Sequence, residues 1–532
     1  MDISNIGLEE RTLGKVIESR LAARPDAPML QDAQTSLSAS EAWHRALSFA
    51  RTLDEVGVGW QEPVALMLDN HVDNVLCWLG TALTGRVEVS VNVAYMGEML
   101  AHVLRDSRAA LLIVEASYLA RVAEIANSIP DLKAVIVRGN ADASIDFLSP
   151  RSSLVLSEPL DASWQKPNSA PVAIRPWDIL SLSYTSGTTG RSKAVLSPHA
   201  HAFGHAATDG LGRTAPGETR FVVLPQFHIA GRWGGVYNAF LRGGCAFIAD
   251  RFHASTYWQE AKAVNASSSQ LVGTMAEFLR LQPPSEHDRD HSLREIGVMP
   301  LPKEPHSWSE RFGVQLTTCY GSTEVGCVLS TVLPVDDSVG QPRGGYDIRL
   351  VDQNDCEVPV GQVGELIVRP LLPWTSSVGY ANCPEQTMQA WRNGWLHSGD
   401  AFIKDRDGNY FFVDRVDDAL RRRGENISSA EAEYLIAKHP YILEVAIVGV
   451  PSEFQEDDVL AVIVRTPGNT VTELDLAKDL SGMLPYFMVP RYIRFVDALP
   501  KTPTEKVQKS VLRAEGAANA WDGQAAGFNP KR

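Results

Sequence analysis

Short apolar runs alternate with helix-like segments over the first third of the chain. The predicted strands are 63–68, 87–91 and 109–114, and the predicted helices between them are 72–83 and 96–104. In segment 72–83 the apolar residues fall on one side, as they do in a helix that covers a sheet. Strands that alternate with helices in this way predict βαβ units and a largely parallel sheet.

The hydrophobic pattern changes farther along the chain. Residues 140–171 are polar and rich in Pro and Ser, which predicts a loop region. The alternation resumes near residue 179 and continues to about 315–319, and short strands and turns follow beyond residue 338, such as 346–351 and 364–368. We therefore predict an α/β fold with a large domain of stacked βαβ-type sheets at 1–416, a β-rich subdomain at about 338–416, and a small α+β domain at 417–532.

Composition and charge narrow the classes of partner. The chain has 532 residues, 44% of them hydrophobic and 21% charged, which is typical of a globular protein with two or more domains. A net charge of -15 argues against nucleic acid as the main partner, because phosphate backbones bind to excess positive charge. The six cysteines form no CxxC pair, and the sequence has neither a signal-peptide pattern nor an apolar run of about 20 residues. We expect a cytoplasmic protein without a membrane span.

A turn rich in Gly, Ser and Thr follows the predicted strand 179–182. Its residues are Thr185, Ser186, Gly187, Thr188, Thr189 and Gly190, and Lys193 comes shortly after them. Glycines let the backbone approach an anion, and clustered hydroxyl and N–H groups can surround phosphate oxygens. The pattern differs from GxxxxGK[ST], so the usual P-loop fold is not indicated. By composition alone, the segment is equally compatible with a flexible surface turn.

The string Tyr184-Thr185-Ser186-Gly187-Thr188-Thr189-Gly190 resembles the phosphate-loop signature of the adenylate-forming superfamily. That superfamily contains acyl-CoA synthetases, the adenylation domains of peptide synthetases and beetle luciferases. Five further matches follow in the expected order, over about residues 60–510. The resemblance implies ATP as a substrate and a C-terminal domain that moves during the reaction.

The segment Tyr320-Gly321-Ser322-Thr323-Glu324 follows a predicted strand at 314–318. The resemblance implies that Tyr320 flanks adenine, that Thr323 touches the α-phosphate, and that Glu324 holds the Mg²⁺ of MgATP, as suits an oxygen ligand of a hard cation. The alternative is an ordinary strand-to-helix turn capped by Ser or Thr. Asp400 ends a match to W-x-x-[ST]-G-D and would accept hydrogen bonds from the ribose hydroxyls.

The next matches concern the hinge and coenzyme A. By resemblance, Arg415 would reach the ribose or a phosphate, and Asp417 would be the residue about which the C-terminal domain turns. An Arg beside acidic residues is also typical of a surface ion pair. Gly424 and Glu425, which follow three arginines, would line the pantetheine tunnel. The arginines would face CoA phosphates or form a solvated charged surface.

Lys506 occupies the catalytic lysine position of the family motif L-P-x-T-x-x-G-K. It would lie between the attacking carboxylate and the α-phosphate and offset the negative charge that accumulates there. Glu505 stands where many relatives have Gly, and Lys501 and Lys509 are competitors for the role.

The acid pocket is predicted around Phe227 and His228, which lie in a segment that resembles the family's border between ATP and acid. In peptide-synthetase domains an aspartate at the His228 position holds the amino group, so histidine argues against an α-amino acid. Arg232 and Trp233 would follow on a helix, with Arg232 facing either an anionic substrate group or an ion-pair partner. The segment Gly297-Val298-Met299 is bulkier than the small residues of many relatives, and together with the string 421–428 it is most similar to the carnitine/crotonobetaine-CoA ligase-like group.

These residues predict an ATP-dependent acid:CoA ligase that uses MgATP and coenzyme A and forms an acyl-adenylate before the thioester. The catalytic residues would be Lys506, Thr323, Glu324 and His228. Three alternatives stay open: an adenylating enzyme that loads a carrier protein, a luciferase-like oxygenase, and a non-catalytic nucleotide-binding relative. A homodimer is compatible with the sequence.

Overall fold

A computed structural model describes residues 5–139, 155–185, 191–302, 304–332, 335, 338–415, 419–453, 456–501 and 507–530. The chain divides into two compact units. The first comprises Met1–Val93, Ala101–Tyr184 and Ala194–Asp414, and the second comprises Ala94–Leu100, Thr185–Lys193 and Arg415–Arg532.

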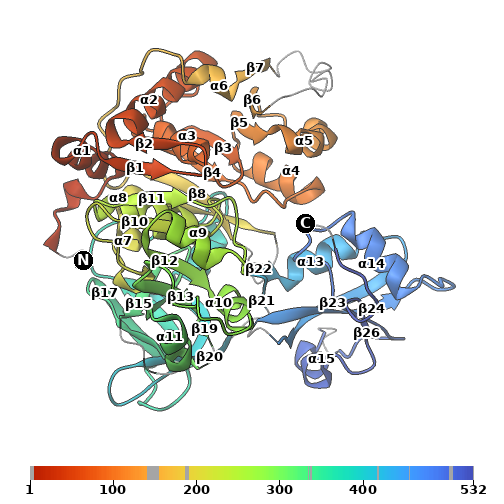
Figure 1. Ribbon diagram of the computed structural model, residues 1–532. Helices are drawn as coiled ribbons and strands as arrows, with labels where there is room; N and C mark the ends of the chain where they lie inside the picture. The colour runs from red at the N-terminus through yellow and green to blue at the C-terminus, as the bar shows by residue number, and fades with distance from the viewer. Residues whose placement is uncertain are drawn as a thin grey trace. The chain divides into compact units, whose positions relative to one another are not determined.

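A seven-stranded sheet in the first unit has the order β7-β6-β5-β3-β4-β8-β9 (Figure 1). Its strands are β3 (Pro63–Met67), β4 (Val87–Ser90), β5 (Leu111–Glu115), β6 (Ala134–Arg138), β7 (Val155–Pro159), β8 (Ile179–Thr185) and β9 (Lys193–Pro198). The strands from β7 to β8 pair in parallel. The connecting helices include α3 (Val72–Leu83), α4 (Gly97–Asp106) and α5 (Leu119–Ile125). The predicted parallel βαβ arrangement is confirmed.

The expected loop at 140–171 was only partly right. Strand β7 and the short helix α6 (Leu160–Ser163) both lie within it. β7 is the edge strand of its sheet and has the sequence Val-Leu-Ser-Glu-Pro, so it lacks the continuous apolar run by which buried strands are recognised.

A 13-stranded sheet of the described residues has the order β17-β18-β19-β20-β16-β15-β14-β13-β12-β10-β11-β1-β2. Its strands are β1 (Pro28–Gln31), β2 (Ser36–Ser38), β10 (Thr219–Val222), β11 (Cys245–Ile248), β12 (Ala266–Val272), β13 (Glu295–Met299), β14 (Gln315–Ser322), β15 (Gly326–Thr331), β16 (Ser338–Pro342), β17 (Tyr346–Val351), β18 (Gly364–Pro370), β19 (Leu396–Lys404) and β20 (Tyr410–Arg415). Pairing is parallel from β1 through β11, β10, β12 and β13 to β14, and antiparallel from β14 to β15 and β16. The β-rich part of the sequence therefore continues the same sheet.

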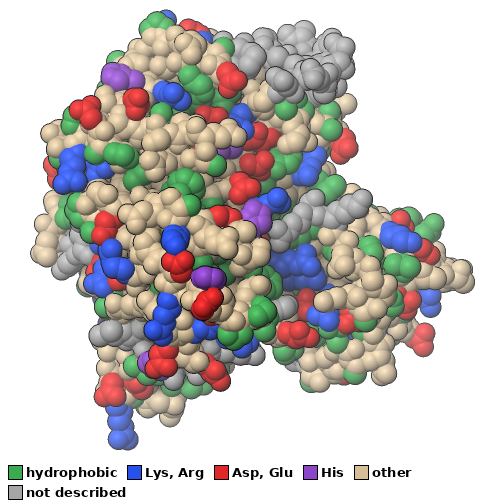
Figure 2. All heavy atoms as spheres, viewed as in Figure 1, with side chains coloured by type: hydrophobic (Ala, Val, Ile, Leu, Met, Phe, Trp, Pro, Cys, Tyr) green, Lys and Arg blue, Asp and Glu red, His purple; other side chains and the backbone are tan. Residues whose placement is uncertain are grey.

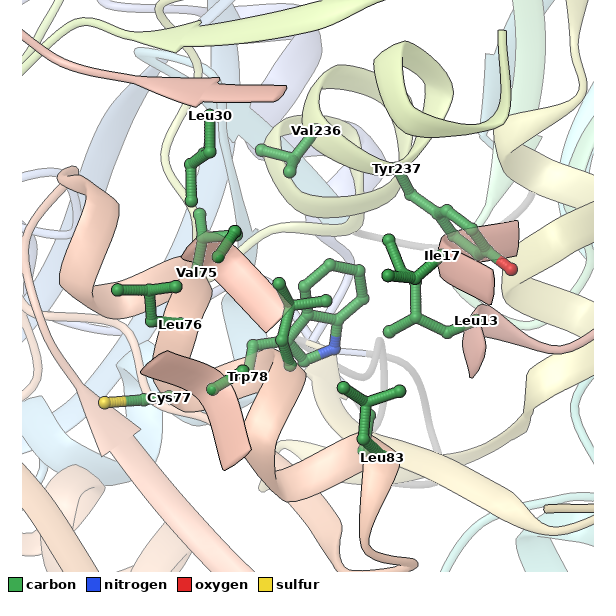
Figure 3. Close-up of a cluster of buried hydrophobic side chains, with 14 of the residues drawn as sticks. Leu13, Ile17, Leu30, Val75, Leu76, Cys77, Trp78, Leu83, Val236 and Tyr237 are labelled. Atoms are coloured by element: carbon green, nitrogen blue, oxygen red, sulfur yellow. The ribbon is translucent and has the colours of Figure 1, made fainter. Parts of the chain in front are cut away.

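The helices of this unit also include α1 (Leu13–Ala23), α2 (Ala39–Val56), α7 (His199–Ala206), the π-helix Ala230–Tyr237, α8 (Asn238–Leu241), α9 (Tyr257–Ala263), α10 (Gly273–Arg280), α11 (Pro305–Phe312) and α12 (Pro384–Ala390). Figure 3 shows Leu13 and Ile17 of α1 around Trp78 of α3, with Tyr237 of the π-helix beside them. All four are fully or almost fully buried, and the rings of Trp78 and Tyr237 meet edge to face at 6.1 Å. Since a buried large side chain contributes about 1.5–3 kcal/mol, this core holds the π-helix firmly against α1 and α3.

The second unit is α+β. It contains the hairpin β21 (Ala419–Arg422) and β22 (Glu425–Ser428), and a four-stranded sheet of β23 (Ile442–Pro451), β24 (Asp457–Arg465), β25 (Tyr492–Phe495) and β26 (Trp521–Asp522). Its helices are α13 (Ser429–Ile436), α14 (Glu473–Ser481) and α15 (Lys509–Glu515). Val448, Leu460, Val462 and Leu512 belong to its hydrophobic core.

Acidic and basic side chains are interspersed over most of the face drawn in Figure 2. Among the described residues, no helix has the length and apolar character that crossing a membrane requires.

Candidate active site

Tyr320 and Asp400 are brought together although they are 80 residues apart in the sequence. Tyr320 lies near the end of β14 and Asp400 lies in β19, and the tyrosine hydroxyl donates a hydrogen bond of 2.5 Å to Asp400 Oδ2. The Tyr320 ring packs edge to face on Phe402 at 4.7 Å, which fixes its plane. An aromatic face beside a buried carboxylate is an arrangement that suits a base and its ribose.

Glu324 lies in the turn that joins β14 to β15, and these strands are antiparallel. The alternative of a strand-to-helix turn is therefore wrong. The turn is tight at Gly321, where an added Cβ would lie 1.9 Å from the carbonyl oxygen of Gly326. Only a glycine allows the two strands to approach this closely.

The Glu324 carboxylate is oriented by a second hydroxyl. Tyr380 donates a hydrogen bond of 3.0 Å to Glu324 Oε1, and the main-chain N–H of Ser377 donates to the Glu324 carbonyl oxygen at 2.7 Å. Burial, and then the nearby Glu324, raise the pKa of Tyr380 well above its ordinary value, so the phenol stays a donor. The backbone beside Tyr380 is bonded to β9 between Gly379 and Leu196. No local sequence pattern marks Tyr380, so its role could not be predicted from the sequence.

The predicted phosphate turn follows β8. Ser186, Gly187, Thr188, Thr189 and Gly190 lie outside the described residues, whereas Thr185 ends β8 and Lys193 begins β9. β8 pairs in parallel with β4, so the turn leaves the carboxyl end of a parallel strand, the edge at which open α/β sheets bind ligands. The hydroxyl of Tyr184 donates to Asp106 Oδ2 at 2.9 Å and holds the end of β8 against α4.

Residues just after the phosphate turn contact helix α13 within the second unit. The main-chain N–H of Ser192 donates to Glu431 Oε1 at 3.3 Å, and Arg191 donates to the Tyr434 hydroxyl at 2.8 Å. Burial raises the pKa of Glu431 to about 7. Glu431 was not among the predicted site residues. Its only sequence signal is an acidic residue on the buried side of α13.

Phe227 and His228 lie in the turn before the π-helix and are half-buried, with ring centroids 4.7 Å apart. The N–H of Arg232 donates to the carbonyl oxygen of His228 at 2.9 Å, so the helical turn that the sequence predicted begins at His228. Asn70 anchors the preceding residues, since its side chain donates to the carbonyl oxygen of Leu224 and accepts from the N–H of Gln226.

Arg232 faces an ion-pair partner, the second of the two possibilities that the sequence left open. Its side chain is 2% exposed and lies 3.0 Å from Glu88 Oε1, and it also donates to Asn74 Oδ1 at 2.7 Å and to Gln226 Oε1 at 3.3 Å. It therefore belongs to a buried ion-pair network, neither to a substrate contact nor to a surface ion pair. Burial raises the pKa of Glu88, and the guanidinium opposes this shift. The clue in the sequence was a Glu between the two valines of strand β4.

Gly297 and Met299 lie on β13, close to β14. A Cβ at Gly297 would meet the backbone of Leu211 at 2.5 Å, so the glycine allows close packing. Met299 Sδ accepts a contact of 2.9 Å from Cys319 Sγ. Trp233 is 1% exposed.

In the second unit, Gly424 donates its N–H to Glu456 Oε1 at 3.0 Å, and Glu425 opens β22. Of the arginines before them, Arg422 is buried beside Asp458 at 3.1 Å, whereas Arg423 is exposed. Lys501 pairs with Glu444 and Lys509 with Glu433. Asp417 and Lys506 lie outside the described residues, and Arg415 is described only as the last backbone residue of β20.

Comparison with known proteins agrees with this arrangement. A model of the AMP-binding enzyme family matches residues 17–371, and a model of the AMP-binding enzyme C-terminal domain matches residues 431–506. A crotonobetaine/carnitine–CoA ligase of Salmonella paratyphi A is 29% identical over 474 residues, covering 87% of this chain and 90% of the relative. The ligase of the same name from Escherichia coli O157:H7 is 28% identical over 467 residues, covering 86% and 89%.

Solved structures share the fold. An anthranilate CoA ligase in complex with anthranoyl-AMP has a TM-score of 0.70 at 24% identity, covering 99% of this chain and 100% of that one. An o-succinylbenzoate CoA synthetase from Bacillus subtilis has a TM-score of 0.79 at 20% identity, covering 96% and 98%.

Proposed function

The chain belongs to the AMP-binding enzyme family, and on this premise we propose that it is an ATP-dependent acid:CoA ligase. The observation that carries the proposal is the hydrogen bond between Tyr320 and Asp400, which brings two separate motifs together. The relatives of similar length, which are named as CoA ligases, support the thioester as the product.

In the proposed site, Tyr320 flanks adenine and Asp400 accepts hydrogen bonds from the ribose, with Arg415 near the ribose or a phosphate. Residues 185–190 and Lys193 surround the phosphates, and Thr323 touches the α-phosphate. The support comes from the strands that carry these residues: Thr185 ends β8, Thr323 directly follows β14, and Asp400 lies within β19.

Glu324 fits a magnesium ion that arrives with ATP. Its carboxylate oxygens suit a hard cation, and Tyr380 holds one of them in place. The described residues contain no group of three or more His, Cys, Asp or Glu side chains arranged for a metal. Mg²⁺ commonly needs only one or two carboxylates together with substrate phosphates, so Glu324 is sufficient. When bound, the ion neutralises phosphate charge.

We infer a reaction in two steps. A carboxylate oxygen of the acid attacks the α-phosphorus of ATP, a new P–O bond forms, and the bond to pyrophosphate breaks. Lys506 offsets the charge that builds up, and His228 borders the acid. The sulfur of coenzyme A then attacks the acyl carbon, and AMP leaves. Most of the acceleration comes from positioning and charge stabilisation.

Thioester formation, the second step, would take place in a different arrangement of the domains from adenylate formation. We propose that the domain 417–532 turns about Asp417 relative to 1–416, which withdraws Lys506 and presents Gly424 and Glu425 to the pantetheine arm. We also propose a cytoplasmic location, and a homodimer as the assembly to test by sedimentation.

The test is pyrophosphate release from ATP with a panel of acids, beginning with crotonobetaine and carnitine because the relatives carry those names. We expect release that depends on one class of acid, and a CoA thioester when coenzyme A is added. Release without thioester, but with acylation of a carrier protein, would contradict the CoA acceptor. Absence of release with every acid would contradict the enzyme.

A further inference from the structure

Glu324, the carboxylate proposed to hold magnesium, has one of its two oxygens occupied by the protein. Tyr380 donates its hydroxyl hydrogen to Glu324 Oε1 at 3.0 Å. An ionised carboxylate only accepts hydrogen bonds and a phenol has a single hydrogen to donate, so the direction of this bond is fixed. The other oxygen, Oε2, has no hydrogen-bond partner among the described residues. Glu324 therefore presents one oxygen to a ligand.

The main chain beside Tyr380 is fixed to β9, the strand that follows the predicted phosphate turn. Leu196 of β9 makes two hydrogen bonds with the residues just before the tyrosine. Its N–H donates to the carbonyl oxygen of Gly379 at 2.9 Å, and its carbonyl oxygen accepts from the N–H of Val378 at 3.0 Å. The phenol is thus carried by a segment that a sheet strand holds in place, as precise positioning of a polar group requires.

Helix α12 holds the same segment from another side. The hydroxyl of Thr387 accepts a hydrogen bond of 2.9 Å from the N–H of Tyr380. Gly379 allows this approach, because it has a φ of +126° and an added Cβ would lie 2.6 Å from Thr387 Cγ2. The N–H of Ser377 donates to the carbonyl oxygen of Glu324 at 2.7 Å. One segment therefore holds the main chain of Glu324 through Ser377 and its side chain through Tyr380.

The number of oxygens that Glu324 offers affects which cation can accompany ATP. Mg²⁺ requires near-ideal octahedral coordination at about 2.0–2.1 Å, whereas Ca²⁺ takes up to about eight oxygens at about 2.3–2.6 Å and accepts bidentate carboxylates. The two oxygens of one carboxylate are too close together to occupy adjacent corners of an octahedron around Mg²⁺. A carboxylate restricted to one oxygen therefore suits Mg²⁺ and denies Ca²⁺ a bidentate ligand.

We propose that Tyr380 is a positioning residue that sets the metal selectivity of the nucleotide site. Because it occupies Oε1, it limits Glu324 to one metal–oxygen bond and so favours MgATP over CaATP. This inference rests on the proposed function, in which Glu324 holds the metal of ATP, and it adds the basis on which that cation is chosen.

The test measures nucleotide binding by isothermal titration calorimetry, without acid or coenzyme A, so that no turnover is needed. Wild type and Tyr380→Phe, which lacks only the hydroxyl oxygen, are each titrated with MgATP, with CaATP and with ATP in EDTA. We expect wild type to bind MgATP more tightly than CaATP, and the variant to lose about tenfold of this preference, which corresponds to about 1.4 kcal/mol. The loss should come mainly from tighter binding of CaATP, because the freed Oε1 can then bind Ca²⁺.

Tyr118→Phe is the matched control. The Tyr118 hydroxyl donates to Asp69 Oδ1 at 2.6 Å, so this variant loses the same kind of bond outside the predicted site residues and should keep the wild-type preference. Thr387→Val is a second variant, which keeps the phenol of Tyr380 but removes the acceptor of its N–H. Its preference for MgATP should also fall, by less than in Tyr380→Phe. The melting temperature of each variant shows whether it is folded.

An unchanged preference in folded Tyr380→Phe overturns the inference and leaves the ligase function intact, as does equal binding of MgATP and CaATP by wild type. If Tyr380→Phe does not fold, the result for Thr387→Val decides in the same way. Failure to bind ATP in any form overturns the ligase function and this inference together. Binding with the expected selectivity, but without pyrophosphate release with any acid, overturns the ligase function alone.

Discussion

Asp400 is the residue whose role can be isolated most cleanly, because it is buried and its known partner is the phenol of Tyr320. Hydrogen bonds to a charged group are worth about 1.5–3 kcal/mol. We expect Asp400→Ala to raise KM for ATP about 10- to 100-fold and to leave KM for coenzyme A nearly unchanged. Steady-state kinetics with each substrate varied will show this, and Tyr320→Phe should have a smaller effect. Equal increases in both KM values would argue against a ribose contact.

Arg232 carries a stability prediction. Removing one member of a buried ion pair leaves the other charge uncompensated, at a cost of about 3–5 kcal/mol. Arg232→Met should lower the free energy of unfolding by that amount in urea titrations, and the double variant Glu88→Gln, Arg232→Met should recover part of it. Lys262→Ala, which breaks the exposed pair with Asp290, is the control and should cost about 0–1 kcal/mol. A loss as small as the control's would contradict the buried network.

At the scale of the element, α13 should give the protein a pH dependence. Burial raises the pKa of Glu431 from an ordinary value of 4.5 to about 7. The folded protein therefore holds this proton more tightly than the unfolded chain, and the stability from it is fully present below pH 4.5. That stability is lost as pH rises through 7, by about 3 kcal/mol.

Glu431→Gln removes the titration. The difference in stability between wild type and variant should therefore shift in favour of the variant between pH 4.5 and 8, as measured by denaturant unfolding. Parallel pH profiles for the two proteins would show that Glu431 titrates at its ordinary value.

Helices and strands were predictable from the sequence where both faces of the sheet are buried. Strands β3, β4 and β5 and helix α3 follow directly from the apolar pattern, because a parallel sheet leaves no polar face. The edge strand β7 was not predicted, because Ser and Glu interrupt the apolar run of its sequence. The hairpin after Tyr320 could not be told from a helix start by local sequence, because the need for a glycine at 321 comes from the carbonyl of Gly326 across the turn.

The sequence motifs identified most residues of the candidate site. The contacts that those residues make with distant parts of the chain were harder to predict. The resemblance assigned Tyr320 to the adenine and Asp400 to the ribose of one nucleotide, and the structure shows a hydrogen bond between the two residues. Glu88 and Tyr380 were missed because their partners, Arg232 and Glu324, lie far away from them in the sequence. The ion-pair partner of Arg232 could not be named from the sequence, since Glu88 lies far away in the chain, on strand β4.

At the scale of the whole molecule, the proposed division of the two steps between domain arrangements has a kinetic signature. Lys506→Ala should lower adenylate formation about 10²- to 10³-fold, the usual scale for loss of one preorganised charge donor. Thioester formation from supplied acyl-AMP should persist, because the lysine has withdrawn by then. Asp417→Pro, which restricts the hinge backbone, should show the opposite pattern. If both variants lose both half-reactions equally, the steps are not divided in this way.

The central claim is that the acid's own oxygen attacks the α-phosphorus of ATP, and one isotope measurement tests it directly. The protein is incubated with ATP, coenzyme A and an acid that it accepts as a substrate, labelled with ¹⁸O in the carboxylate. The masses of the products are measured by mass spectrometry. An acyl-adenylate intermediate transfers one ¹⁸O atom to AMP, in step with formation of the acyl-CoA. AMP without the label, or label found in inorganic phosphate with ADP as the co-product, would contradict the account.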